Sequence, residues 1–140
     1  IQQLLNENQK SRNSLKEVHN SVELVLQRAS DLYHESRYDD AAKILQDVSE
    51  KHPSDFRAHS MLGNAYFREK RYNDAVMQYE RVIDLDPLNE KACENLAIAY
   101  ANLGQLVRAI HQWERLLRMT PNRTDIQKSI QKAKAFLNKS

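Results

Sequence analysis

Small and large apolar side chains recur along this chain at helical spacing, in blocks that repeat. In each block an alanine precedes a large apolar or aromatic residue by four positions, as Ala75 precedes Tyr79. Residues four apart lie one turn apart on the same face of an α-helix. A proline follows each block and ends a helix, because it lacks a backbone N–H and disfavours helix in the residue before it. The pattern predicts helix pairs at 22–36 and 38–51, at 56–69 and 72–85, and at 90–103 and 106–119.

The prolines give the length of the repeat, because Pro53, Pro87 and Pro121 are 34 residues apart. Four further columns keep the same interval, and they are Ala41, Ala75 and Ala109; Leu45, Tyr79 and Trp113; Val48, Val82 and Leu116; and Leu32, Tyr66 and Tyr100. Chance is a poor explanation for columns that stay in register over three periods, so the chain is predicted to be a repeat protein.

Small residues in these columns predict where helices approach closely and where the chain turns. A larger side chain than alanine would wedge the two helices of a pair apart, and Gly63 offers a second position of close approach. Gly104 falls in the turn between the helices of the third repeat, where glycine adopts a left-handed backbone at little cost. Ser36 and Lys70 hold that place in the other repeats, so we expect their turns to be costlier.

Both ends of the chain depart from the repeat. Residues 124–127 read Thr-Asp-Ile-Gln, a capping-box start, and a last helix over 124–137 places Ile126, Ile130, Ala133 and Leu137 on one side. Its polar outer side is typical of a helix that caps a solenoid. Residues 14–17 form a second capping box, so the first helix starts either near 22 or near 14. Residues 1–13 are interpreted as disordered or loosely helical, with the end of an upstream helix and a coiled-coil stub as alternatives.

These columns resemble the tetratricopeptide repeat (TPR) family. The family's pattern is met in the second repeat by Leu62, Gly63, Tyr66, Ala75, Tyr79 and Pro87, and in the third by Leu96, Ala97, Tyr100, Ala109, Trp113 and Pro121. The first repeat is degenerate in its first helix, and the family's leading Trp is replaced throughout, by Val25, His59 and Cys93. The resemblance implies an all-α fold, a right-handed α-solenoid of antiparallel helix pairs. Its expected parts are an N-terminal extension or helix (1–19), three repeats (20–53, 54–87 and 88–121) and a capping helix (122–140).

Composition agrees with a helical domain and leaves few other classes. Hydrophobic residues make up 41% of the 140 residues, charged residues make up 29%, and only two glycines and three prolines occur. This balance disfavours general disorder and a many-turned β fold. No apolar run approaches the ~18 residues that a membrane helix needs, so we expect no membrane insertion within this segment. Cys93 is the only cysteine, which excludes an internal disulfide and favours a small buried apolar role.

No group of residues predicts catalysis. The five histidines include no close pair of the HExxH kind, and phosphate-binding glycine loops and nucleophile elbows are absent from the sequence. Asp39 and Asp40 open a helix, where negative charge complements the helix dipole. We therefore expect no enzyme activity, no metal site and no cofactor. Residues 122–140 carry a net charge of +4, but Phe136 is their only aromatic residue, so nucleic acid is not an expected partner.

The resemblance implies a concave groove lined by the first helix of each pair, suited to a peptide or a helix. The expected groove residues are Tyr33, Arg57, Asn64, Phe67, Arg68, Lys91, Asn95, Ile98 and Asn102. Their basic and aromatic character favours an acidic segment with an apolar or aromatic anchor.

Asn64 and Asn95 lie 31 residues apart, as do two asparagines in family members that clamp the C-terminal carboxylate of heat-shock chaperones. That clamp also needs basic partners, and the matching places here hold Ser60, Asp125 and Ser129. The resemblance to the clamp is therefore incomplete.

The favoured function is a non-catalytic scaffold or adaptor domain that binds a peptide or helix of a partner protein. The alternative is a structural oligomerisation module of a larger, membrane-anchored protein. In that case the N-terminal segment joins copies of the chain, or the opposite charges of residues 20–53 (−3) and 122–140 (+4) do so. The first residue is Ile1 rather than Met, so we expect a fragment. Cytoplasm is the default compartment, and a tethered or exported location stays open.

Overall fold

The computed structural model describes residues 1–139, apart from the side chain of His19, and this part of the chain is helical without strands. Its helices are α1 (Gln2–His34), α2 (Tyr38–Lys51), α3 (Phe56–Arg68), α4 (Tyr72–Leu85), α5 (Glu90–Asn102), α6 (Leu106–Met119) and α7 (Thr124–Asn138). From α2 onward they begin and end within two residues of the ranges that the repeat predicts.

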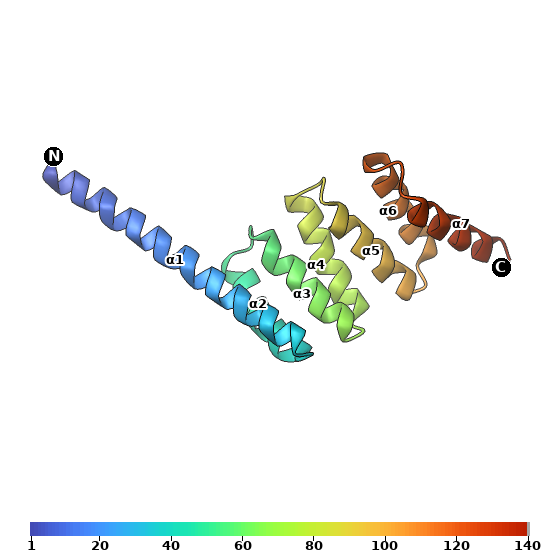
Figure 1. Cartoon of the computed structure of the whole chain (residues 1–140), viewed down its shortest axis with the longest axis horizontal. Coiled ribbons are helices and arrows are strands. Elements are labelled where there is room, and N and C mark those ends of the chain that lie inside the picture. Colours follow the sequence, from blue (N-terminus) through green and yellow to red (C-terminus); the bar gives the residue numbers. More distant parts are fainter. Residues whose placement is uncertain (140) are drawn as a thin grey trace.

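The helices form antiparallel hairpins that stack in chain order (Figure 1). α1 pairs with α2, α3 with α4 and α5 with α6, while α2 also packs on α3, α4 on α5, and α6 on α7. Ala41, Ala75 and Ala109 are fully buried. These contacts confirm an all-α solenoid of helix pairs, in which the alanines allow the helices of each pair to approach.

Large side chains of the repeat are buried within the stack. Leu45, Tyr79 and Trp113 are all buried, and so are Val82 and Leu116. Burying an apolar side chain of this size contributes roughly 1.5–3 kcal/mol. The core is therefore one continuous cluster to which all seven helices of the described chain contribute.

Each hairpin turn contains one residue in the left-handed region of backbone space. Gly104 has a φ of 75°, and Ser36 and Lys70 have φ values of 63° and 62°. The sequence-based prediction of a shared turn conformation is confirmed. Because L-residues with a Cβ pay about 1–2 kcal/mol in this region, the two earlier turns are strained where the third is not.

Side-chain caps fix the starts of two first helices. Asp55 accepts a hydrogen bond from the backbone N–H of Arg57 at 3.0 Å, and Asn89 accepts one from that of Ala92 at 2.9 Å. These caps satisfy backbone donors that a helix start leaves unpaired. They also fix where α3 and α5, which carry most of the candidate groove residues, enter the stack.

The first helix is longer than the sequence predicted. It begins at Gln2, so residues 2–13 are helical, as one of the alternatives for this segment had it, and a disordered tail is wrong. The helix start predicted at the capping box of residues 14–17 is also wrong. Residues 2–13 contain neither Gly nor Pro. Most of them are Leu, Gln, Lys, Arg or Glu, which favour helix, and Asn is the main exception. At 33 residues the helix is about 50 Å long, and its N-terminal half projects beyond the stacked hairpins (Figure 1).

The last helix closes the stack as the sequence suggested, with two differences. Ile126, Ile130 and Ala133 are buried against the last hairpin, but Leu137 is more than a third exposed. The residue before the helix is Arg123, and no side chain caps the start, so the predicted capping box at Thr124 is wrong. The side chain of Gln127 instead donates a hydrogen bond to the carbonyl of Pro121. Ser140, the last residue of the expected capping segment, lies outside the described residues.

Candidate binding groove

A cavity of about 300 Å³ lies where α1, α3 and α5 stand side by side. Its lining combines three aromatic rings, two amides, two cations and one aliphatic side chain, and the residues are Tyr33, Asn64, Phe67, Arg68, Tyr79, Lys91, Asn95 and Ile98. We call this set the binding groove. Helices from all three repeats contribute to it, so the groove exists only in the assembled stack.

Asn64 is at the centre of a polar network in the groove. The buried hydroxyl of Tyr79 donates a hydrogen bond to Asn64 Oδ1 at 2.7 Å, and Asn95 Nδ2 donates to the same oxygen at 3.4 Å. Burial raises the pKa of the Tyr79 hydroxyl, so this group remains a donor at neutral pH. The oxygen of Asn64 thus accepts from two donors, which uses both of its lone pairs.

Aromatic side chains surround this polar network. The rings of Tyr33 and Tyr38 meet edge to face with centroids 5.1 Å apart, and Phe67 meets Tyr72 in the same way at 5.2 Å. Such pairs hold the rings in fixed orientations, which reduces the ordering cost when a ligand binds. Tyr33 and Phe67 are half-buried, so part of each surface remains open to an apolar group.

The charge of the groove is positive. Arg68 and Lys91 are exposed, and no carboxylate occurs among the described residues that line the cavity. The Arg68 guanidinium lies 5.1 Å from the ring centroid of Tyr38, within the range of a cation–π contact. That contact orients the arginine without neutralising it, so its charge remains available to an acidic ligand.

Seven of the nine residues expected from the sequence line this cavity, and Arg57 and Asn102 do not. Arg57 donates to Asp55 Oδ2 at 2.9 Å and also pairs with Glu23 on the neighbouring repeat. Its hydrogen bonds hold the pKa of Asp55 below the usual range. Asn102 donates to the carbonyl of Ile98 at 2.9 Å on its own helix. The expected cluster of three cations is thus reduced to two.

Sequence reasoning missed Tyr79 as a groove residue because the repeat assigned it a packing role. Its ring does pack between helices, at 2% exposure, while its hydroxyl reaches the groove. The signal was the residue type itself, since Leu45 and Trp113 fill the same column without a hydroxyl. A buried tyrosine commonly finds a hydrogen-bond partner.

His59 and Cys93, two residue types that often serve in metal or reactive sites, have structural roles in this protein. His59 is buried, with one ring nitrogen 2.9 Å from Gln78 Oε1 and the other 2.9 Å from the carbonyl oxygen of Pro53. Cys93 is fully buried, and burial raises the pKa of its thiol, which disfavours the reactive thiolate.

Over the described residues, no three His, Cys, Asp or Glu side chains gather as a metal site would require. None of the helices in that same part of the chain is both long and apolar enough to cross a membrane.

Comparison with known proteins assigns this geometry to a family. Two family models described as tetratricopeptide repeat match residues 26–90 and 66–133. The chain belongs to the tetratricopeptide repeat family. Its TPR hairpins account for the 34-residue spacing and for the fully buried alanines. No curated protein sequence matches the chain.

Solved TPR structures share the fold at low sequence identity. The first TPR of Spaghetti (RPAP3), bound to an HSP90 peptide, has a TM-score of 0.77 and 20% identity, over 84% of this chain and 93% of that one. The Yersinia enterocolitica type III secretion chaperone SycD, in complex with a peptide of the translocator YopD, has a TM-score of 0.78 and 20% identity, over 86% and 96%. MamA has a TM-score of 0.80 and 23% identity, over 91% and 74%.

Proposed function

We propose that this TPR domain is a non-catalytic protein-interaction module whose binding groove holds an acidic segment of a partner protein around an apolar anchor. The observation that carries the proposal is the composition of the groove, in which cations, amides and open aromatic surface from three repeats face one cavity. Such a mixture suits a peptide, because amides can pair with its backbone while aromatic surface takes a side chain.

Relatives of the same fold support a peptide as the ligand. RPAP3 domains were solved with an HSP90 peptide, SRMEEVD, and an HSP70 peptide, SGPTIEEVD, and SycD was solved with a peptide of YopD. Both RPAP3 peptides end in acidic residues around a valine. The two cations of this groove, Arg68 and Lys91, suit a ligand of similar charge.

The groove differs from a site built for a terminal carboxylate. Asn64 and Asn95 are present and linked by a hydrogen bond. The places where basic partners would be needed hold Ser60, Asp125 and Ser129. The cations present, Arg68 and Lys91, lie beside the aromatic rings instead. We therefore propose that the ligand is an internal acidic segment rather than a free C-terminus.

The experiment measures the binding of a fluorescent, end-capped peptide in which glutamates flank one leucine. We expect Arg68→Gln and Lys91→Gln each to weaken binding about three- to tenfold, since each removes one ligand-facing charge at the rim. Asn64→Ala should weaken it by a similar factor. Arg81→Gln is the matched control, because Arg81 is exposed on α4 outside the groove. This substitution removes the same charge without changing the groove.

Two further measurements test the chemistry of the ligand. Raising the salt concentration should weaken binding, because it screens exposed charges. A peptide with lysines in place of the glutamates should not bind. Equal affinity of all variants, or equal binding of the lysine peptide, would overturn the groove assignment. Tighter binding of the same peptide with a free C-terminus would favour a carboxylate clamp.

A further inference from the structure

The N-terminal half of α1 and the residue before it carry large apolar side chains that are at least half exposed. Ile1, Leu4, Leu15 and Val18 are 98%, 65%, 70% and 50% exposed. Exposed apolar residues scattered singly need no explanation, but these lie along one line of the helix.

The line is a heptad seam, with apolar residues alternating at three- and four-residue steps. It runs through Ile1, Leu4, Leu15, Val18, Val22, Val25, Ala29 and Leu32, with the polar residues Asn8 and Ser11 between Leu4 and Leu15. From Val22 onward the seam packs on the stacked hairpins, and Ala29 and Leu32 are at most 2% exposed. The seam that joins α1 to its own repeat therefore continues toward the N-terminus for more than four turns, in which its apolar side chains are at least half exposed. A two-stranded coiled coil uses such a seam.

The exposed part of the seam is self-complementary when read in the opposite direction. In an antiparallel pair in which the numbers of facing residues add to 19, Ile1 faces Val18, Leu4 faces Leu15, and Asn8 faces Ser11. Each layer then matches apolar with apolar or polar with polar. In heptad notation Ile1, Asn8 and Leu15 are a positions, and Leu4, Ser11 and Val18 are d positions. Every layer of this pairing therefore joins an a position of one copy to a d position of the other, as an antiparallel coiled coil requires.

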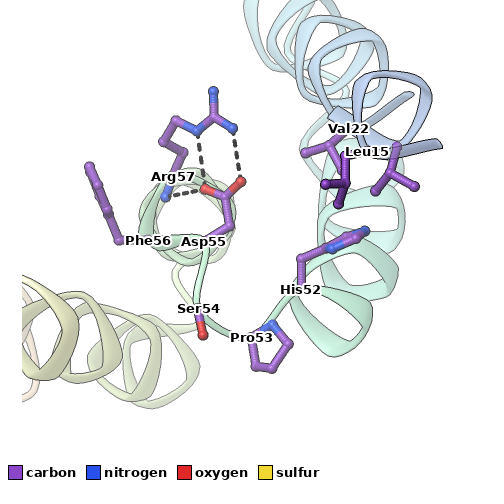
Figure 2. Close-up of a pocket in the computed structure, with 9 residues that line it drawn as sticks. Leu15, Val22, His52, Pro53, Ser54, Asp55, Phe56 and Arg57 are labelled. Carbon is purple, nitrogen blue, oxygen red and sulfur yellow. Dashed lines mark hydrogen bonds and ion pairs between the residues drawn. The ribbon is translucent and has the colours of Figure 1, made fainter. Parts of the chain in front are cut away.

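The ends of this pairing meet a cavity. Leu15, Val18 and Val22 line one side of an open cavity of about 580 Å³, and the α2–α3 loop and the start of α3 line the rest of it. In Figure 2 Leu15 and Val22 lie beside His52, across a gap from Arg57 and Phe56. In the antiparallel pair, Ile1 and Leu4 of a second copy would lie against Val18 and Leu15 and fill this cavity.

A parallel pair would match like residues with like, but the stacked hairpins oppose it. The hairpins cover the seam from Val22 onward. In a parallel pair both stacks would therefore lie at the same end, on the face where the two helices must meet, and they would compete for the same space. The antiparallel arrangement places the two stacks at opposite ends. Its two-fold symmetry also closes the assembly at two copies, because each seam is fully used.

We propose that residues 1–18 form an antiparallel two-stranded coiled coil with the same residues of a second copy of this chain. The binding groove begins at Tyr33, beyond the paired segment, so the dimer presents two open grooves. The proposal does not depend on what the grooves bind.

Sedimentation of the chain over a range of concentrations tests the proposal. We expect a monomer–dimer equilibrium that persists at high salt, because the paired layers are uncharged. Leu15→Glu should weaken the dimer about a hundredfold, since symmetry places the substitution in two layers. It should leave the helix content of the monomer unchanged, because Leu15 is exposed there. Leu24→Glu is the matched control, since Leu24 is 72% exposed on the same helix away from the seam.

Disulfide cross-linking tests the direction of the pair. A mixture of Leu4→Cys and Leu15→Cys chains should form a cross-linked heterodimer on mild oxidation. Neither variant alone should do so, because in the antiparallel pair the two copies of residue 15 lie about 16 Å apart along the axis. The native Cys93 is fully buried and does not compete.

Three results would overturn the proposal. The first is a monomer at every concentration. The second is a dimer that dissociates with salt, which would point to contact between the acidic and basic ends instead. The third is efficient cross-linking of the Leu15→Cys chain with itself, which would show a parallel pair.

Discussion

Gly63 on α3 lies so close to Tyr79 on α4 that a Cβ added at Gly63 would be 2.7 Å from the Cε1 atom of the tyrosine ring. Helices α3 and α4 therefore meet at a distance that only glycine permits with this ring between them. The same tyrosine donates a hydrogen bond to Asn64 Oδ1, which orients the amide in the binding groove. A packing position thus positions a groove residue.

We predict that Gly63→Ala destabilises the domain. The added methyl group must displace a ring that is 2% exposed and hydrogen-bonded, and overpacking of this kind costs about 1–3 kcal/mol. The better helix propensity of alanine offsets roughly 1 kcal/mol of that cost. Urea denaturation measures the net change in the free energy of unfolding.

The matched test is the pair of substitutions Gly63→Ala and Tyr79→Leu. Leucine lacks the ring that the methyl group would contact, so the alanine should be tolerated better in the double variant than in the single one. Additive effects of the two substitutions would show that the steric explanation is wrong.

The three hairpin turns predict opposite effects of glycine. Ser36→Gly and Lys70→Gly should each stabilise the domain by about 0.5–1 kcal/mol, because glycine removes strain at positive φ but costs entropy in the unfolded chain. Gly104→Ala should destabilise it by about 1 kcal/mol through φ alone, since no atom lies within 4 Å of the added Cβ. Thermal unfolding measures all three, and a loss of stability in both glycine variants would contradict this account.

Stability should fall in alkaline solution because of buried tyrosines. Burial, together with a hydrogen bond to Glu80, raises the pKa of Tyr100 to about 12. An unfolded tyrosine has a pKa of about 10, so above that pH the unfolded chain releases a proton that the folded chain retains. The contribution of Tyr100 is fully present below about pH 10 and is lost as the pH rises toward about 12.

Tyr100→Phe provides the control, because it removes the titrating hydroxyl and keeps the ring. The free energy of unfolding of this variant should fall less steeply with pH than that of the unsubstituted chain. Some fall should remain, since the pKa values of Tyr66 and Tyr79 are also raised by burial. Identical pH dependence of the two proteins would exclude Tyr100 as a contributor.

Sequence spacing predicted the helices of the stack well because each repeat column has one physical role. A fully buried alanine such as Ala75 and a helix-ending proline such as Pro87 act through local geometry, which recurs every 34 residues. The start of α1 was not predicted, because the N-terminal half of this helix belongs to no repeat. Its helix depends on residue propensity over a long segment, and no turn residue or column marks its start.

The groove was only partly predictable for a different reason. Family columns indicate which helix face a residue occupies, and they placed Asn64, Phe67 and Lys91 on the face that lines the cavity. They do not indicate which neighbours capture a long side chain. Arg57 points to Asp55 and Glu23 because a carboxylate two residues away and another on α1 of the neighbouring repeat outcompete solvent.

Each helix of this fold contacts chiefly its neighbours along the chain, from α1 through to α7. Cooperativity in such an array passes from one hairpin to the next, so the position of a defect determines how much structure is lost with it. A substitution that disrupts packing between α3 and α4 interrupts the stack in its middle and disrupts the groove. A substitution that disrupts the packing of α7 unfolds only the C-terminal end of the stack and leaves the remaining hairpins folded.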